Sequence, residues 1–562
     1  MTGSRLFSIP PGVPFLHQLA QSLCNGELVE GFCHRDDDPL GLSRATIYVP
    51  TRRAARALRS EFVDLLNRKS AILPTIRPLG ENDDDSGFLE EDQPALLDLL
   101  PPISGPGRLL ELAQLIMVWK QNLPTNIADF HGDNRLIAPA NPADAVWLAR
   151  SLADLLEAME TEKRPWSALQ ELVADDYAHW WQLTLEFLKI ATIFWPARLA
   201  ELNSSDPAAH RNAVLHAETE RLRKVPPAGP VIIAGSTGSI PATAELMKVV
   251  AGLDQGAIVL PGLDVALDAR IWALVGGDEL AQSVDPTRCA HPQYGLSVLL
   301  RRFSADRSDV HELGELSPPM RARNQLVSSA LMPAEATALW AEDKTDADTI
   351  RDVFEGVELI EAASEREEAL AVAAAMRLAA EPQGDDGAQA SGSDPHRSQP
   401  RHIALVTPDR NLARRVASEL QRFGIDANDS GGAFLALKPQ GTLLQLLLQS
   451  AFGSERTLAL VSMLKHPLMR FQRDAGTARK AGRIIERVAL RDGVADANAA
   501  ELSSLFERRL EERLLQERHA PYWLKRLSEA DIALARDLAV DIEQAYKPLM
   551  ERVPSASPDD GT

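Results

Sequence analysis

The sequence has 562 residues, of which 45% are hydrophobic and 25% are charged, and its formal net charge at pH 7 is −21. These values are ordinary for a soluble globular protein, and the length predicts about three or four domains. The negative charge argues against a protein that is basic over its whole surface and binds duplex nucleic acid indiscriminately. It still allows a channel with a local positive lining.

The sequence indicates neither a membrane-spanning helix nor the disulfide framework of a secreted protein. The sequence has no run of about 20 apolar residues, and its N-terminal segment lacks the unbroken apolar core of a signal peptide. The three cysteines, Cys24, Cys33 and Cys289, are too few for a disulfide framework and lack metal-ligand spacing. We therefore expect a cytoplasmic protein in which each cysteine is a buried thiol.

Residues 1–90 contain a strand that leads into an arginine-rich helix. The run Ile47–Val49 is typical of a strand, and Thr51 is a good N-cap for the helix that follows. Apolar residues recur at helical spacing and predict the buried stripe of this helix: Ala55, Leu58, Phe62 and Leu65. Four arginines lie near its start: Arg52, Arg53, Arg56 and Arg59.

Residues 91–225 have the helical period almost throughout, so we expect an inserted helical subdomain here. Six of the nine tryptophans fall in this block: Trp119, Trp147, Trp166, Trp180, Trp181 and Trp195. Such residues can form a platform on which bases stack. Core packing of a helical subdomain is the favoured explanation.

Strand signals return in residues 226–350. Val231–Ile233 is a short apolar run, and a second strand-to-loop pattern follows at 256–264, GAIVLPGLD. A glycine- and serine-containing turn joins the first run to a helix: Gly235, Ser236, Thr237 and Gly238. The helical block is therefore predicted to interrupt a single α/β domain made of 1–90 and 226–350.

Residues 351–440 predict a second α/β unit, with Ser364 and Glu367 as a capping box. Residues 381–400 are rich in Gly, Ser, Pro and Asp, and we expect a disordered insertion there. The segment VTPDRNLAR repeats Pro-x-Arg-x-x-Ala-Arg from YVPTRRAAR, so Arg410 and Arg414 correspond to Arg52 and Arg56. Two such matches at strand-to-helix edges predict two related α/β domains in tandem.

Residues 441–562 predict a helical subdomain that is basic at 470–491, RFQRDAGTARKAGRIIERVALR, and ends in a polar stub.

Tandem α/β domains with a helical insertion are the layout of nucleic-acid motors, but the residues for ATP hydrolysis are missing. A motor needs a Gly-rich loop ending in Lys-Ser/Thr and an acidic residue at the end of a second strand. The loop SIPPGVPFL at 8–16 has one glycine and no lysine, and Gly235–Thr237 replaces the acidic residue. That turn can bind an anion through backbone N–H groups, but a tight turn for close packing is favoured.

No catalytic or metal-binding motif is recognisable either. The string EDK at 342–344 lies in a polar loop, and we reject it as a nuclease motif. We expect no cofactor in this chain.

The arginines are the remaining candidates for a functional site. Arg52, Arg56 and Arg59 share one helix face, and Arg53 lies near the free N–H groups of the helix start; both kinds of donor suit phosphate oxygens. Arg410, Arg414 and Arg415 are candidates for the same role in the second unit. The alternative is a solvated face with ion pairs to Glu61 or Asp64, and the residues alone leave both explanations open.

The sequence resembles a known family over nearly its whole length and in order. The segments that carry the resemblance are LFSIPPGVPFLHQLAQSL, LSRATIYVPTRRAARALRSEFVDLL, AILPTIRPLGE, GPVIIAGSTGSIPATAELM, HPQYGLSVLLRRF and RHIALVTPDRNLARRVASELQRFGIDA. They look like the B subunit of the AddAB double-strand-break repair helicase–nuclease, in its alphaproteobacterial form.

The resemblance implies tandem RecA-like domains of the UvrD helicase type with large inserted helical subdomains. It also implies a partner, an AddA-like subunit that carries the active motor with its ATP and magnesium, and action on single-stranded and broken duplex DNA. The family's C-terminal nuclease motif has no counterpart before residue 562, so we expect an N-terminal portion of a longer protein. On this basis the chain would guide single-stranded DNA without an ATPase motif of its own; the alternative is a non-catalytic scaffold that stabilises the AddA-like subunit.

Overall fold

The computed structural model describes residues 5–66, 71–79, 99–123, 139, 141–167, 178–276, 286–341, 347–380, 403–432, 434–491, 496–515 and 522–550. The insertion expected at 381–400 and the EDK string at 342–344 lie outside these residues. The chain folds as two units, Met1–Val357 and Glu358–Thr562. Among the described residues, no helix combines the length and the apolar character that crossing a membrane requires.

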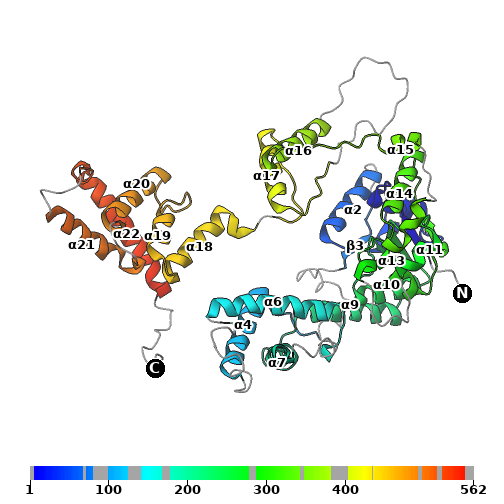
Figure 1. The fold of residues 1–562 in the computed structure, drawn as a ribbon, viewed down its shortest axis with the longest axis horizontal. Helices are drawn as coiled ribbons and strands as arrows, with labels where there is room; N and C mark the ends of the chain where they lie inside the picture. Colours follow the sequence, from blue (N-terminus) through cyan, green and yellow to red (C-terminus); the bar gives the residue numbers. More distant parts are fainter. Residues whose placement is uncertain are drawn as a thin grey trace, which may run out of the picture. The chain divides into compact units, whose positions relative to one another are not determined.

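A parallel sheet of six strands organises the first unit; its edge strand β3 is labelled in Figure 1. Its order is β3–β2–β4–β5–β1–β6, and every pairing is parallel. The strands are β1 (Leu6–Ile9), β2 (Thr46–Val49), β3 (Thr75–Pro78), β4 (Val231–Ala234), β5 (Gly256–Pro261) and β6 (Val310–Glu312). Strand β2 pairs with β4 in the register Thr46↔Val231, so strands from before and after the helical block form one sheet.

Helices cover both faces of this sheet, which explains why its strands are apolar on both sides. One face packs against α1 (Phe15–Asn25) and α2 (Arg52–Leu65), with Leu19, Leu58 and Phe62 in the core. The other packs against α9, α10 and α13, with Leu246 and Leu299 in the core. These helices span Pro207–Lys224, Pro241–Ala251 and Tyr294–Phe303. Further elements complete the unit: η1 (Gly41–Arg44), α11 (Ala269–Gly276), α12 (Pro286–Cys289), η8 (Arg307–Asp309), α14 (Pro318–Ala330), η9 (Ala334–Ala341) and α15 (Ala347–Val353).

The inserted block is helical, as its periodicity predicts. It comprises α4 (Gly105–Gln121), α6 (Pro142–Thr161), α7 (Ala178–Lys189), the π-helix η7 (Ile190–Phe194), α8 (Trp195–Glu201) and α9. Trp195 is fully buried in its core, and Trp119 and Trp166 pack partly buried against it, which confirms core packing for these three. Trp147 differs, because 77% of it is exposed on α6. The side chains of Trp180 and Trp181 lie outside the described residues.

A buried ion pair ties the helical block together. The Arg108 guanidinium on α4 and the Asp206 carboxylate before α9 are both nearly inaccessible and approach to 2.9 Å. Asp206 also accepts a hydrogen bond from the indole N–H of Trp195 at 3.1 Å and caps α9, while Arg108 also donates to the Ala153 carbonyl. The charges are therefore paired and hydrogen-bonded, as burial demands.

A second network joins the block to the sheet. The Tyr48 hydroxyl on β2 donates to the Glu218 carboxylate on α9, and Arg221 binds that carboxylate through two 2.8 Å hydrogen bonds. Burial raises the pKa of the Tyr48 phenol well above its ordinary value. Burial also tends to raise the pKa of Glu218, but hydrogen bonds from Arg221 and Tyr48 outweigh this effect, so that its pKa lies below the ordinary value.

The second unit begins with two packed helices, α16 (Glu365–Ala380) and α17 (Arg410–Arg422). Ser364 caps α16 as predicted, and the Asp409 carboxylate caps α17. The strand expected before α17 is not formed: residues 403–407 carry no strand pairing, and Val406 is 93% exposed. Leu359, in the β-rich run before α16, is 88% exposed. A strand forms only where a neighbour supplies hydrogen bonds, and the described part of 358–432 supplies none.

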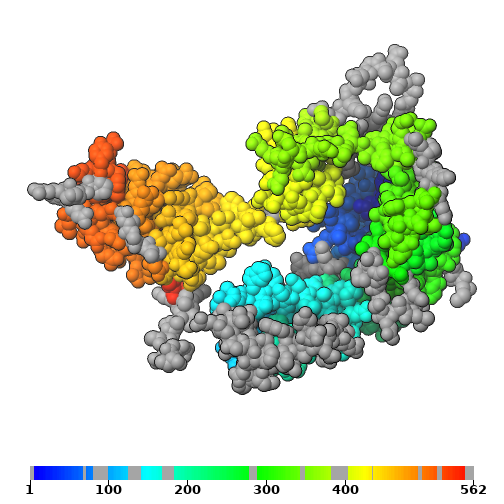
Figure 2. Space-filling model, in the orientation of Figure 1, coloured from blue at the N-terminus to red at the C-terminus, as the bar shows by residue number. Residues whose placement is uncertain are grey.

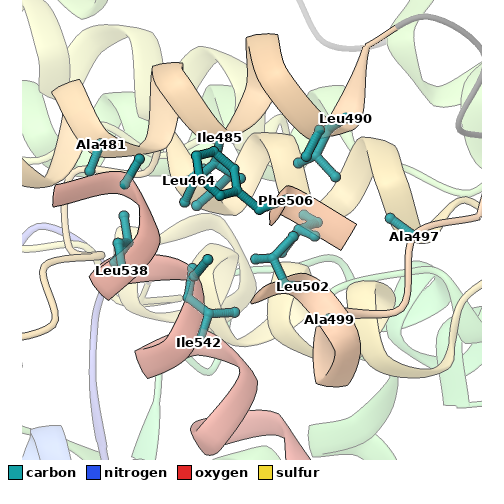
Figure 3. Packing of buried hydrophobic residues seen from close by; sticks show 14 of the residues in the cluster. Leu464, Ala481, Ile485, Leu490, Ala497, Ala499, Leu502, Phe506, Leu538 and Ile542 are labelled. Carbon is teal, nitrogen blue, oxygen red and sulfur yellow. The ribbon is translucent and has the colours of Figure 1, made fainter. Parts of the chain in front are cut away.

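A helical bundle follows, in agreement with the sequence. Its elements are η11 (Leu435–Leu437), α18 (Pro439–Phe452), α19 (Arg456–Leu464), α20 (Ala475–Ile485), the π-helix η12 (Glu486–Leu490), η13 (Ala499–Glu501), α21 (Leu502–Leu515), η14 (Leu524–Arg526) and α22 (Glu529–Met550). They enclose one large core that includes Leu464, Ile485, Phe506 and Ile542 (Figure 3). The space-filling view shows these segments, yellow-orange to red, packed into a continuous body (Figure 2).

The prediction that every cysteine is a buried thiol is wrong for two of the three. Cys24 is partly buried, and burial raises the pKa of its thiol to about 11. Cys33 and Cys289 are exposed. They lie in the loop after α1 and at the end of the short helix α12, where the surrounding chain does not cover them.

Replacing Arg108 with Met is expected to loosen the helical block, because it leaves the Asp206 carboxylate buried and unpaired. Such a loss costs about 3–5 kcal/mol. Hydrogen exchange measured by mass spectrometry should show faster exchange in peptides from α4 and α6. The control is Arg198→Met, which removes partly exposed pairs with Glu111 and Glu201 and should cost at most about 1 kcal/mol for each pair. Equal protection in the two variants would contradict this account.

Candidate functional site

The carboxyl edge of the sheet gathers the predicted site residues of the first unit. Strand β2 ends at Val49 and α2 begins at Arg52. Thr51 caps the helix as predicted, its hydroxyl accepting from the Ala54 N–H at 3.1 Å. Carboxyl ends of parallel strands lie at one edge of a sheet, which is where ligands bind in α/β proteins. The start of α2 and the turn after β4 therefore share this edge.

The four arginines of α2 have different surroundings. Arg59 donates a 3.0 Å hydrogen bond to the Ile76 carbonyl and so fastens β3 to the helix. Arg53 and Arg56 are exposed, and Arg52 is half-buried; Arg52 and Arg53 each interact with another residue. In the described part of the chain, no carboxylate lies within 4 Å of the Arg56 guanidinium.

The two acidic residues named as alternative partners, Glu61 and Asp64, do not form the predicted ion pairs with the arginines of α2. Glu61 instead approaches the His17 imidazole, with 3.1 Å between Oε2 and Nδ1. No ion pair of Asp64 with an arginine of α2 is found among the described residues. The solvated face with pairs to these two acids is therefore not the observed arrangement.

The arginines of α17 are used differently. Arg410 forms a bidentate pair with Asp429, at 3.0 and 2.8 Å, and donates to the Gly432 carbonyl. Arg415 pairs with Glu365 at 2.5 Å. Among the described residues, Arg414 makes only a long contact of 3.4 Å with Asn411. Arg410 and Arg415 thus hold the loop 425–432 and the start of α16, a structural use that the repeat with α2 did not predict.

The Gly/Ser turn after β4 is shaped for close packing. Gly235 and Gly238 have φ of +79° and +60°. A Cβ on Gly238 would approach Leu299 of α13 to 2.5 Å, and one on Gly235 would meet Phe15 and Pro50 at 3.4–3.5 Å. The Gly238 N–H donates to the Ser236 hydroxyl at 3.2 Å. These contacts support the tight-turn explanation, and they bring the loops after β1, β2 and β4 together.

The loop after β1 does not fit a nucleotide phosphate. Pro10, Pro11 and Pro14 have no N–H to offer, and the Val13 N–H donates to Pro10 at 3.2 Å. A Cβ on Gly12 would lie 2.4 Å from the Met320 side chain, so α14 fills the space above the loop. The residues here therefore fit ATP poorly, and no chemical step through ATP follows for this chain.

A cavity of about 690 Å³ lies beside this loop, at the carboxyl ends of β1 and β5. The helices that follow these two strands cover opposite faces of the sheet, which makes their junction a topological switch point. The lining is mostly apolar, and its polar groups are largely used within the protein. Asp264 accepts from Ser328 at 2.5 Å, Gln293 donates to Gly262 at 2.9 Å, and Asn324 donates to Pro11 at 2.8 Å.

The sequence did not reveal this cavity lining. Asp264 follows a predicted strand, in GLD after β5, and that position was a usable signal because it places the residue at the carboxyl edge. Asn324 and Ser328 come from α14, far along the chain, and no local pattern pointed to them. Among the described residues, no group of three or more His, Cys, Asp or Glu side chains is placed to hold a metal ion.

Comparison with known proteins gives no assignment: no family model matches the chain, and no curated protein matches it.

Gly238→Ala is expected to destabilise the first unit by about 2–4 kcal/mol, because Leu299 is fully buried and cannot move aside. Urea unfolding followed by tryptophan fluorescence measures the change. Gly356→Ala is the matched control: its φ is +73° but nothing lies within 4 Å of the added Cβ. It should lose only the backbone cost of about 1–2 kcal/mol, and equal losses in both variants would disprove the close-packing role.

Proposed function

We propose that this chain is a helicase-like subunit without a motor of its own, which guides single-stranded DNA in an AddAB-type helicase–nuclease during double-strand-break repair. Its fold would be a tandem pair of RecA-like domains with inserted helical subdomains. Its partner would be an AddA-like subunit that binds ATP and magnesium. The sequence resemblance motivates this assignment, and the geometry of α2 supports it.

The observation that carries the proposal is the arginine-rich start of α2 at the carboxyl edge of the sheet. Two guanidinium groups, on Arg53 and Arg56, reach solvent beside the free N–H groups of a helix start. Both kinds of donor favour phosphate oxygens. Phosphate contacts hold a strand in place without reading its bases, which is the behaviour expected of a guide.

The nucleotide chemistry is assigned to the partner for a physical reason. The proline-rich loop after β1 offers few N–H donors, and Met320 fills the space where phosphates would approach. Binding of a fluorescent ATP analogue with magnesium by this chain alone would instead support an active motor and contradict the proposal.

A second candidate function is a scaffold that stabilises the AddA-like subunit. The pairs Arg410–Asp429 and Arg415–Glu365 favour it, because they show that arginines of the second unit are used to hold structure. In the proposed guide, these residues therefore contribute less than the start of α2.

The triple variant Arg52→Ala, Arg53→Ala, Arg56→Ala separates the two functions. If each arginine contacts one phosphate, the slope of log affinity for single-stranded DNA against log salt concentration should become shallower by roughly 2. Binding at low salt should also be weaker. Fluorescence anisotropy with a labelled oligonucleotide over a range of salt measures both quantities.

The control makes the same change in charge at arginines that are exposed and paired with nearby acids. It combines Arg35→Ala, Arg270→Ala and Arg351→Ala, whose partners are Asp37, Asp268 and Asp348. If the chain guides single-stranded DNA, this control should keep the same dependence of affinity on salt as the unaltered chain. An unchanged slope in the α2 variant would favour the scaffold.

A further inference from the structure

Helix α18 of the second unit, labelled in Figure 1, is apolar on two opposite faces. It contains no Asp, Glu, Lys, Arg or His, whereas every other α-helix in the described part of the chain contains at least one of these residues. A helix that is apolar all round is normally buried on all sides. The two faces of α18 nevertheless have different surroundings.

One face of α18 belongs to the helical bundle. Leu443, Leu446 and Leu447 pack against the bundle core. Ser450 is buried on the same side, and its hydroxyl lies 2.5 Å from the hydroxyl of Tyr546 on α22. These contacts fix the rotation of α18 about its own axis, so the direction of its other face is fixed as well.

The opposite face of α18 is exposed. Leu444, Leu448 and Phe452 recur at four-residue spacing and therefore form one stripe along the helix; we call them the α18 stripe. Each of the three is about half exposed. Gln445 and Gln449 lie beside the stripe and are exposed too. The described part of the chain thus leaves an apolar helix face uncovered.

The short helix η11 lengthens this apolar surface. Gly441 lies on the face of the α18 stripe, because it precedes the three members by three, seven and eleven positions. The backbone of η11 packs directly on Gly441, where the Leu435 carbonyl leaves no room for a Cβ. Leu435, Leu437 and the preceding Phe434 are exposed. They therefore continue the stripe at its N-terminal end.

The six side chains expose enough area for a small specific interface. Their exposed fractions run from 49% to 75%. At about 150–200 Å² for a fully exposed large side chain, they present roughly 600 Å². Two such surfaces would bury roughly 1,200 Å² in total, the low end of the range for specific protein interfaces. A contiguous apolar patch of this size on a soluble protein marks a site of interaction.

We propose that the α18 stripe, together with η11, binds the same surface of a second copy of this chain. In such a pairing across a two-fold axis, each side chain must suit its own kind. Leucine and phenylalanine do so, and so do the amides of Gln445 and Gln449, because an amide both donates and accepts hydrogen bonds. The inference does not depend on the proposed function.

The distribution of charge favours a second copy at this surface. The whole chain has a net charge of −21, so two copies repel each other over most of their surfaces. Residues 434–454 contain a single charged side chain, Lys438, and the stripe itself contains none. The surface therefore offers a copy of itself little repulsion, and it offers little attraction to a partner that is recognised by its charge.

Sedimentation velocity of the full chain tests the pairing. Over roughly 1–100 μM, where a small interface dissociates, the unaltered chain should show an equilibrium between monomer and dimer. Leu444→Gln with Leu448→Gln should weaken dimerisation by about ten-fold or more, because polar amides would replace the centre of the interface. The matched control, Leu359→Gln with Leu515→Gln, makes the same change at leucines that are 88% and 84% exposed outside this surface and should dimerise like the unaltered chain.

Cross-linking tests the two-fold geometry independently. Leu448 is the middle residue of the α18 stripe, so it should approach its own copy near the axis. Cys33→Ser and Cys289→Ser first remove the two exposed thiols. In this background a short bis-maleimide should link two chains that carry Leu448→Cys, and it should leave chains that carry Leu515→Cys unlinked.

Three results would overturn the inference. The first is an unaltered chain that stays monomeric at the highest concentration, which would assign the surface to a different polypeptide. The second is a dimer that persists in the Leu444→Gln, Leu448→Gln variant, because the chains would then pair through another surface. The third is an equal loss of dimer in the control, since that would indicate unspecific association.

Discussion

The parallel pairing of β2 with β4 is the constraint on which the candidate site depends. These strands lie on opposite sides of the helical block in the sequence, and their register places Tyr48 opposite Ile233. That register brings the end of β2 and the end of β4 to the same edge, so the start of α2 approaches the turn at Gly235. The Tyr48–Glu218–Arg221 network adds a polar link from the same strand to the inserted helices.

Local features of this arrangement were predictable because their causes are local. The caps at Thr51 and Asp409 and the buried stripe of α2 follow from residue types and helical period. The interruption of one sheet by a helical block also followed from pattern alone. Strands β1, β3 and β6 were not identified, because three or four residues carry little periodic signal.

Features that depend on contacts between residues far apart in the chain could not be predicted from the sequence. The repeat between the two arginine motifs suggested one shared role, yet Arg410 is held by Asp429, a residue beyond its own helix. The β-rich run at 403–407 has strand composition, but composition does not supply a neighbouring strand, and Val406 remains exposed. Likewise, Trp147 shares the helical context of Trp195 but lies on the outer face of α6.

The segments that precede α4 and α9 are fastened to each other. The Ile103 N–H donates to the Ser205 carbonyl at 3.0 Å, and the Ser205 N–H donates to the Pro101 carbonyl at 2.9 Å. The stretch of chain from α4 to α8 therefore begins and ends at nearly one point. A set of helices whose two ends are hydrogen-bonded to each other can be lengthened, shortened or exchanged during evolution without shifting the alignment of the strands on either side. Its outer surface is thereby free to diversify while the sheet stays fixed.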